Sequence, residues 1–514
     1  MKIFSWKTLC RLRYTANFLL LAILIIAFSG IVLPWGLSGK LPAVQFMPVI
    51  LRLLTISGAV ALAILLILLL ISILCGRFYC TWICPLGILQ DWLERLNNRI
   101  FRRNPRKYEP ALTWVRWSCF ALFIACLSSG LLLPGGFMEP YSLFGKIASG
   151  VLRQLLEYLN ISTINLEQSP IEPSAAWRIY LTISASGFII LLLIAAIRGR
   201  IFCNTVCPVG FILAQISRKS VYSLQIDRQK CVKCQKCVKA CNAHCISINA
   251  NANIEFDRCF MCMECLRACP ASAISIALRS KKTASADSNS LAMPERRRVI
   301  LGAGAIGTAA FLGGKLLKKT AVVPEGAIAP PGASSAEDFI QRCTNCGLCM
   351  ANCRGGCLQP ATGEYGWRGF MLPVMKFDGT HPGKCEYECN NCMKNCPTGA
   401  LKPMPLAEKK LCRIGMARFY PNNCLAYQDG EPCGACAEHC PTGALKMVPG
   451  PHEFAAVPQV IKELCIGCGN CQFACPVTPQ AIRVSGVKKQ SRATAPSEYN
   501  RQKKTKKAPE TIPF

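Results

Sequence analysis

The segment CVKCQKCVKACNAHCISINANANIEFDRCFMCMECLRACP, residues 231–270, decides the fold of the first soluble part of the chain. It holds two cysteine runs with the spacing C-x2-C-x2-C-x3-C, at residues 231–241 and 259–269. Gaps of two residues let three sulfurs of one short loop reach three iron corners of a cuboidal cluster. Residues 221–280 are therefore predicted to form an α+β module with two [4Fe–4S] clusters.

The fourth cysteine of each run is expected to ligate the cluster of the other run, as in two-cluster proteins with this spacing. One predicted ligand set is Cys231, Cys234, Cys237 and Cys269. The other predicted set is Cys259, Cys262, Cys265 and Cys241. Asn242 replaces the proline that follows the second run, and the nearby Cys245 is an alternative ligand. Two complete runs this close together favour clusters over a zinc site or disulfides.

Four more runs lie in residues 326–485, which are predicted to form a second module with four clusters, about six in the whole chain. The predicted ligands are Cys343, Cys346, Cys349, Cys353, Cys385, Cys389, Cys392, Cys396, Cys424, Cys433, Cys436, Cys440, Cys465, Cys468, Cys471 and Cys475. Near-copies of Pro-Thr-Gly-Ala-Leu at residues 397–401 and 441–445 indicate internal duplication. The sequence leaves open which runs exchange their fourth cysteine. It also leaves open whether Cys357 and Cys412 are substitute ligands or buried thiols.

Composition excludes several other classes of protein. The chain has 35 cysteines but four histidines, and residues 1–243 contain no histidine. A bis-histidine haem in that part is therefore excluded, and no C-x-x-C-H motif is present to attach a c-type haem, so no haem is expected. The formal net charge is +31, but the basic residues flank apolar segments rather than line a groove. Nucleic acid is therefore not an expected partner.

Residues 1–220 are predicted to form a four-helix domain in the lipid bilayer of a bacterial inner (cytoplasmic) membrane. Four apolar segments have about the length that crosses a bilayer: Tyr14–Trp35, Val49–Cys75, Ala111–Leu133 and Trp177–Ile197. Lysine and arginine concentrate in residues 1–13 and 95–107, whereas residues 134–176 carry more acidic than basic side chains. By the positive-inside rule, the ends of this multi-pass domain and the first module are expected in the cytoplasm.

Residues 281–325 are predicted to carry the chain across the membrane again. Three arginines, Arg296–Arg298, precede a weakly apolar stretch, Val299–Leu317. The stretch is either a twin-arginine export signal or a fifth helix with positive charge on its cytoplasmic side. Both interpretations place the second module in the periplasm. The basic residues 486–514 are expected to form a disordered tail.

A repeat links the second and fourth apolar segments. GRFYCTWICPLG at residues 76–87 matches GRIFCNTVCPVG at residues 199–210. Each copy follows an even-numbered segment, so both are expected at the cytoplasmic face, close to each other. Their cysteines are Cys80, Cys84, Cys203 and Cys207. The repeat is either an additional metal or redox centre or a pair of structural corners, with Arg77 and Arg200 anchored at lipid headgroups.

These motifs resemble two known families. Residues 1–280 resemble the NapH family of membrane quinol dehydrogenase subunits, whose membrane unit NosR-type proteins share, and residues 294–484 resemble the NapG family of periplasmic ferredoxin-type proteins. The chain is thus similar to a NapH–NapG fusion. The resemblance implies a multi-domain protein: an α-helical membrane bundle of four helices and an expected fifth, with two α+β bacterial ferredoxin-like modules. It also implies oxidation of quinol from the quinone pool and electron delivery to a periplasmic c-type cytochrome or terminal reductase, such as nitrate reductase.

Quinol oxidation requires a proton acceptor, because quinol gives up two protons with its two electrons. Glu139 and Tyr141, before an expected amphipathic segment at residues 143–159, are the candidates. A solvated loop carboxylate is the alternative interpretation of Glu139. Two other functions stay open: a non-enzymatic accessory role in the maturation of a redox enzyme, and a wire fed by a cytosolic ferredoxin without quinone.

Overall fold

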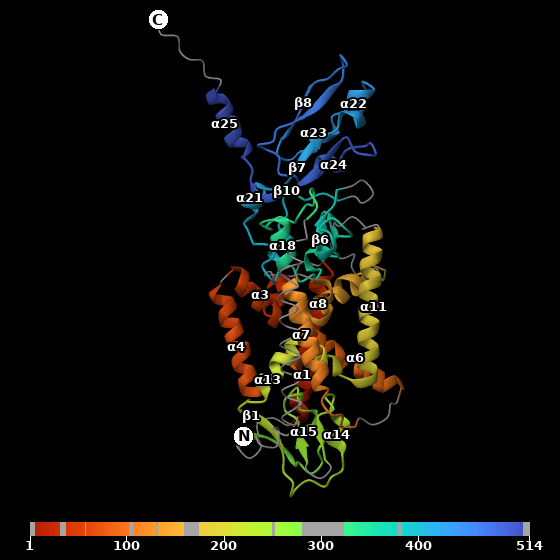
Figure 1. Cartoon of the computed structure of the whole chain (residues 1–514), viewed down its shortest axis with the longest axis vertical. Coiled ribbons are helices and arrows are strands. Elements are labelled where there is room, and N and C mark those ends of the chain that lie inside the picture. Colours follow the sequence, from red (N-terminus) through yellow and green to blue (C-terminus); the bar gives the residue numbers. More distant parts are fainter. Residues whose placement is uncertain are drawn as a thin grey trace. The chain divides into compact units, whose positions relative to one another are not determined.

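The structure, a computed structural model, describes residues 6–30, 37–56, 58–101, 107–129, 132–158, 174–248, 252–279, 323–377 and 383–506 (Figure 1). The chain divides into two units. The first comprises residues 1–28, 40–154 and 183–320, and the second comprises residues 29–39, 155–182 and 321–514. The expected export signal or fifth helix at residues 299–317 lies outside the described residues.

Among the residues that the structure describes, two helices are long and apolar enough to cross a membrane by length and composition, α1 (Trp6–Phe28) and α11 (Ala175–Arg198). The segment expected to be one helix over residues 49–75 is divided into α3 (Phe46–Ile56) and α4 (Ala59–Cys75). The backbone of Gly58, just before α4, is extended, so the helix cannot continue through it.

The third apolar segment forms α7 (Thr113–Ser129), which is shorter than predicted. Helices α4, α7 and α13 are apolar but have no more than 17 residues each. The predicted four-helix membrane bundle is therefore not confirmed within the described residues.

The two copies of the repeat fold in the same way. Helices α4 and α11 are each followed by a glycine with left-handed backbone, Gly76 (φ 67°) and Gly199 (φ 59°), which glycine adopts without strain. The short helices α5 (Tyr79–Trp82) and α12 (Ile201–Thr205) follow. Each copy then enters a helix at a proline, α6 (Pro85–Phe101) and α13 (Pro208–Ser217). Proline suits this first helical position because its missing N–H would have no helical partner there.

Short helices complete this part of the chain. Helix α2 (Leu37–Ala43) precedes the first copy. Between the copies lie α8 (Leu132–Met138), α9 (Pro140–Lys146), the π-helix η2 (Ile147–Leu152) and α10 (Arg153–Tyr158). Every residue of α9 is buried. The surroundings of Glu139, just before α9, are therefore not a solvated loop.

The first cysteine-rich module has the predicted α+β architecture. Strand β1 (Tyr222–Ile226) pairs antiparallel with β4 (Ile274–Leu278), and β2 (Ile246–Ser247) with β3 (Asn253–Ile254). Helices α14 (Lys236–Ala240) and α15 (Glu264–Ala268) carry the third cysteine of each run and pack against each other. The module belongs to the same unit as α1, α4 and α7.

Three antiparallel strand pairs organise the second unit. They are β5 (Leu358–Pro360) with β6 (Pro373–Met375), β7 (Cys412–Phe419) with β10 (Ile482–Arg492), and β8 (Leu445–Pro449) with β9 (Ala456–Val460). Short helices connect them: α18 (Ala336–Arg342), α19 (Leu348–Ala351), η5 (Trp367–Gly369), α20 (Asn391–Lys394), α21 (Leu406–Lys409), η6 (Pro421–Asn423), α22 (Leu425–Gln428), α23 (Ala435–Glu438) and α24 (Asn470–Phe473).

The expected disordered tail is partly ordered. Residues 486–492 continue β10, and α25 spans Pro496–Lys506. The first residues of the tail pair with β7, because Ser491 and Arg492 lie opposite Arg413 and Cys412. Residues 507–514 lie outside the described residues.

Candidate iron–sulfur sites

The two runs of the first module share one backbone conformation. Lys233 and Gln235 have φ of 51° and 57°, and Met261 and Met263, at the same positions of the second run, have φ of 50° and 63°. Side chains other than glycine rarely adopt this left-handed region, and such strain persists only where the surroundings demand it. The left-handed residues on both sides of the second cysteine turn the loop tightly, as a loop that presents several sulfurs to one cluster requires.

The structure brings the fourth cysteine of each run to the other run. Burial, followed by the neighbouring Cys269 and Cys231, raises the pKa of Cys237 to about 11. Burial also raises the pKa of Cys265 well above its usual value, and the thiols whose charges raise it further are Cys262, Cys259 and Cys241, followed by Cys237 of the other set. Both groupings coincide with the expected ligand sets, whose binding of clusters stays a prediction.

Cys245 also lies at the second ligand set. Its Sγ is 3.6 Å from Cys241 Sγ, and it shares a hydrogen bond with Cys259. Cys241 and Cys245 therefore remain alternative fourth ligands of the same set.

Two runs of the second unit repeat the loop conformation of the first module. Asn345 and Gly347 have φ of 57° and 78°, and Gly467 and Gly469 have φ of 72° and 80°. Asparagine and glycine tolerate this region better than other residues do. Asparagine or glycine on each side of the second cysteine is therefore a sequence signal for this loop conformation. The other two runs, with first gaps of three and eight residues, lack this pattern.

The exchange of ligands left open by the sequence has a clear geometry in the second unit. The thiols whose charges act on Cys349 are Cys343, Cys346 and Cys396, followed by Cys392. Those around Cys392 are Cys385, Cys389 and Cys353. Those around Cys436 are Cys433, Cys424 and Cys475. Those that act on Cys471 are Cys468, Cys465 and Cys440, followed by Cys436. The structure thus groups the fourth cysteine of each of the first two runs with the other run, and it groups the third and fourth runs in the same way. That these sets hold clusters stays a prediction.

Two of these four sets line cavities. One cavity is lined by Cys424, Cys433, Cys436 and Cys475. The other is lined by Cys353, Cys357, Cys385, Cys389 and Cys392. Cys357 Sγ lies 3.8 Å from Cys353 Sγ, and Cys357 is buried, so both predicted alternatives, a substitute ligand of this set and a buried thiol, stay open.

Backbone N–H groups point at the fourth cysteine of several runs. The amides of Ala273, Leu401 and Ala481 donate to Cys269, Cys396 and Cys475 Sγ at 3.3, 3.4 and 3.4 Å. Hydrogen bonds to cysteine sulfur stabilise thiolates and tune cluster potentials. The cavities, the loops and these donors fit [4Fe–4S] clusters.

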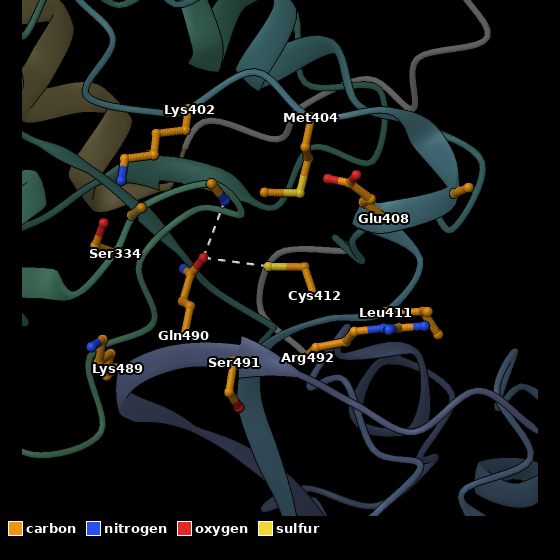
Figure 2. Close-up of a pocket in the computed structure, with 13 residues that line it drawn as sticks. Ser334, Lys402, Met404, Glu408, Leu411, Cys412, Lys489, Gln490, Ser491 and Arg492 are labelled. Atoms are coloured by element: carbon orange, nitrogen blue, oxygen red, sulfur yellow. Dashed lines mark hydrogen bonds between the residues drawn. The ribbon is translucent and has the colours of Figure 1, made fainter. Parts of the chain in front are cut away.

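Cys412 lies away from the ligand sets. It lines a pocket with about 1160 Å³ of empty space, together with the side chains labelled in Figure 2. Cys412 Sγ is 3.5 Å from Gln490 Oε1, which also accepts from the Gly332 amide at 3.1 Å. No cysteine of the predicted ligand sets lines this pocket, so Cys412 is not placed as a ligand.

The four cysteines of the repeat lie together in the first unit. Their side chains are 3–5% exposed. The thiol of Cys207 lies within electrostatic range of the thiols of Cys203, Cys80 and Cys84. Hydrogen bonds also join the two copies. Arg77 Nη2 donates to the carbonyl oxygen of Cys203 at 2.7 Å, and Arg200 Nη1 donates to that of Cys80 at 3.1 Å.

The arginines of the repeat are not anchored at headgroups. Arg77 is 0% exposed and Arg200 is 1% exposed, so that interpretation is wrong for both. Arg200 forms a buried ion pair with Asp91, with Nε 2.6 Å from Oδ1. Arg77 donates to Asn204 Oδ1 and to the carbonyl oxygen of Asp257.

The first module docks on the repeat through both of its runs. The Phe260 ring lies between the two arginines, with its centroid 4.3 Å from Arg77 Cζ and 4.9 Å from Arg200 Cζ. The Phe260 carbonyl oxygen accepts from Thr81 Oγ1 at 2.8 Å. Asn242 Nδ2 donates to Asp91 Oδ1 at 3.1 Å, which gives a structural role to the residue that replaces proline after the first run.

Glu139 is buried within electrostatic range of Cys84, one of the four cysteines of the repeat. It is 3% exposed, and its carboxylate caps α9 by accepting from the amides of Tyr141 and Ser142. Burial raises its pKa, while the amides and the Lys146 ammonium partly offset that effect. Its charge also acts on Cys84 and on Tyr79, whose hydroxyl donates to Gln45 Oε1 at 2.9 Å. Tyr141 is also buried, and the centroid of its ring lies 6.2 Å from the ring centroid of Phe28.

Comparisons with known proteins agree with these sites. A family described as "4Fe-4S binding domain" matches residues 57–107 and 181–224, and one described as "4Fe-4S dicluster domain" matches residues 431–479. The two pieces of the first match contain the two copies of the repeat and none of the ligands predicted for either module.

Several characterised sequences are similar to parts of the chain. The ferredoxin-type protein MauM of Paracoccus denitrificans, named for methylamine utilization, is 32% identical over 176 residues, 33% of this chain and 75% of MauM. The ferredoxin-type protein NapF of Escherichia coli is 31% identical over 154 residues, 29% of this chain and 81% of NapF.

The putative electron transport protein YccM of Escherichia coli is 25% identical over 217 residues, 40% of this chain. The chain spans about half the length of YccM, 54%. No solved structure matches the chain. From the cysteine sets and these similarities, the chain belongs to the ferredoxin-type 4Fe–4S electron-transfer proteins.

Proposed function

We propose that the protein oxidises quinol at the bacterial inner membrane and passes the electrons to a periplasmic acceptor, a c-type cytochrome or terminal reductase. The observation that carries the proposal is the burial of Glu139 within electrostatic range of Cys84 and Tyr79. The likeness of residues 1–280 and 294–484 to the NapH and NapG families also supports it. When bound, [4Fe–4S] clusters supply one-electron redox chemistry.

Glu139 is the proposed proton acceptor of the quinol. Oxidation of one quinol releases two electrons and two protons, and a buried carboxylate with a raised pKa accepts a proton closer to neutral pH than a solvated one does. The Lys146 ammonium lies within electrostatic range of Glu139. The positive charge of Lys146 partly balances the negative charge of the buried Glu139 carboxylate. The amides of Tyr141 and Ser142 fix the carboxylate in one orientation.

The proposed topology places the first module in the cytoplasm and the second in the periplasm. α1 and α11 have the length and composition to span a bilayer, and the distribution of lysine and arginine gives the orientation. Protease added to spheroplasts tests this placement. We expect cleavage of the second module in intact spheroplasts, and cleavage only after lysis would exclude a periplasmic module.

The activity is tested by anaerobic EPR of the purified, cluster-loaded protein mixed with menaquinol or ubiquinol. We expect reduction of its clusters, lost with a quinone-site inhibitor and slowed at least tenfold in the Glu139→Gln variant. Glu109→Gln is the matched control, because Glu109 belongs to the same unit and its side chain is 38% exposed. Clusters that strong chemical reductants reduce, but neither quinol does, would contradict the proposal.

An accessory role is the second candidate, favoured by the similarity to MauM and NapF, which are named as ferredoxin-type proteins. Such a role requires clusters but no quinol site. It predicts that Glu139→Gln has no effect on cluster reduction by any donor. The same quinol experiment therefore separates the two functions.

A further inference from the structure

We propose that Cys80, Cys84, Cys203 and Cys207 together ligate a further iron–sulfur cluster, outside both cysteine-rich modules. These four side chains come from two copies of one motif and meet in the interior of the first unit, 3–5% exposed. The assignment of the ligands stands on this geometry. The role of the cluster as an electron relay rests on the proposed function.

The backbone around the four cysteines is built for close approach. A Cβ on Gly87 would lie 2.2 Å from the carbonyl oxygen of Cys80, and one on Gly210 would lie 2.2 Å from that of Cys203. In both copies, the helix that begins at the Cys-Pro pair therefore lies directly against the first cysteine of the same copy. The arginines then join each copy to the first cysteine of the other.

The charges around the set favour an anionic group. Arg77 and Arg200 are both buried, but within the described residues only Arg200 forms an ion pair, with Asp91. A buried cation without a counter-charge costs several kcal/mol. A cluster with four thiolates carries about two negative charges in its oxidised form, which would balance the remaining positive charge.

Two of the cysteines sit where helices stabilise thiolates. Cys84 and Cys207 immediately precede α6 and α13. Cys207 Sγ accepts from the Gly210 amide at 3.3 Å, and Cys84 accepts from the Gly87 amide in the same way. Amide donors and the positive end of a helix favour the thiolate, the form that binds metal.

Other uses of four cysteines fit less well. All four are free thiols in the structure, so the copies are not joined by disulfides. Among the described residues, no three Cys, His, Asp or Glu side chains converge as they would on one metal ion. The same is true of the ligand sets predicted for the two modules. The match of both copies to a "4Fe-4S binding domain" agrees with this assignment.

The position of the set suits an electron relay. Cys84 lies within electrostatic range of Glu139, the proposed proton acceptor. On the other side, the Phe260 carbonyl oxygen accepts from Thr81, the residue after Cys80, and Phe260 itself follows Cys259 in the second run. The two electrons of a quinol would leave one at a time through this set to the clusters of the first module.

Iron and acid-labile sulfide are to be counted in the full-length protein, purified anaerobically and reconstituted, with Mössbauer spectroscopy to assign the iron. We expect about seven clusters per chain, hence about 28 irons, rather than about six. The Cys80→Ser/Cys203→Ser variant is expected to lose about four irons and four sulfides. Cys119→Ser/Cys126→Ser, in the apolar α7, is the matched control and should lose none.

The wild-type count keeps the proposal falsifiable if the double variant does not fold. Six clusters in a fully reconstituted wild-type chain, zinc in place of iron, or a disulfide among the four cysteines would each overturn it. The count does not depend on quinol. Seven clusters that quinol cannot reduce would refute the proposed function and leave the ligand assignment standing, whereas six clusters that quinol reduces would do the reverse.

Discussion

Arg77 donates a 2.7 Å hydrogen bond to the carbonyl oxygen of Cys203, a residue of the other copy of its own motif. Arg200 makes the reciprocal bond to Cys80 at 3.1 Å. Each arginine is buried, so it is stable only where its partner copy supplies acceptors. The two copies therefore form one structural site, although about 120 residues separate them in sequence.

The close approach in each copy predicts the effect of adding one methyl group. In Gly210→Ala, the new Cβ would lie 2.2 Å from the Cys203 carbonyl oxygen and 2.8 Å from Arg77 Nη2. Because backbone cannot yield as a flexible side chain does, we expect a loss of about 2–4 kcal/mol in the free energy of unfolding. Thermal unfolding in detergent measures it.

Gly58→Ala is the control for this substitution. A Cβ at Gly58 meets nothing within 4 Å, and its φ of −93° suits alanine. Its effect should stay within about 1 kcal/mol. Equal losses in the two variants would mean that the contact at Gly210 is not what holds the copy in place.

Phe260 predicts a coupling between the first module and the repeat. The side chain is 2% exposed and lies between two arginines. Phe260→Ala removes a buried ring and two cation–π contacts, so we expect destabilisation by about 3–5 kcal/mol. Calorimetry of the cluster-loaded protein checks the value. Phe454→Ala, at a residue 91% exposed, should change the stability by less than about 0.5 kcal/mol.

The raised pKa of Glu139 predicts a pH dependence of stability. A carboxyl group whose pKa is higher in the folded than in the unfolded protein stabilises the fold below its ordinary value of 4.5. That contribution is lost as the pH rises through the raised pKa. The groups that face Glu139 are Lys146, which lowers its pKa, and Tyr79 and Cys84, which its own charge affects.

The Glu139→Gln variant isolates this effect, because its amide does not titrate. We expect the wild type to lose stability relative to this variant as the pH rises from 5 to 8, measured by thermal unfolding. A constant difference of about 0.5–2 kcal/mol at all pH values would indicate that Glu139 acts only as the cap of α9.

The sequence predicted which cysteines lie together more reliably than it predicted helix boundaries and the surroundings of single side chains. The spacing of cysteines constrains which sulfurs can reach one cluster, so residues 231–270 alone predict the two ligand sets of the first module. The hydropathy of a segment does not reveal where its backbone leaves the helical conformation. The segment predicted as one helix is divided at Gly58, whose backbone is extended. A charged residue in a polar stretch is usually solvated, which is why Glu139 was open to that interpretation although α9 and its neighbours bury it. The role of Asn242 depends on Asp91, 151 residues away, and no local pattern contains that contact.

The exchange of cysteines in the second unit makes a prediction that counting iron can test. Cys396 belongs to the second run by sequence, but it lies with the first run's Cys343 and Cys349. Cys343→Ser/Cys396→Ser therefore removes two ligands from one cluster, and we expect the chain to lose about four irons. Cys385→Ser/Cys396→Ser changes two cysteines of a single run but reaches two clusters, so we expect a loss of about eight. If each run instead kept its own four cysteines, the two losses would be reversed, because the first pair would then reach two clusters and the second pair only one.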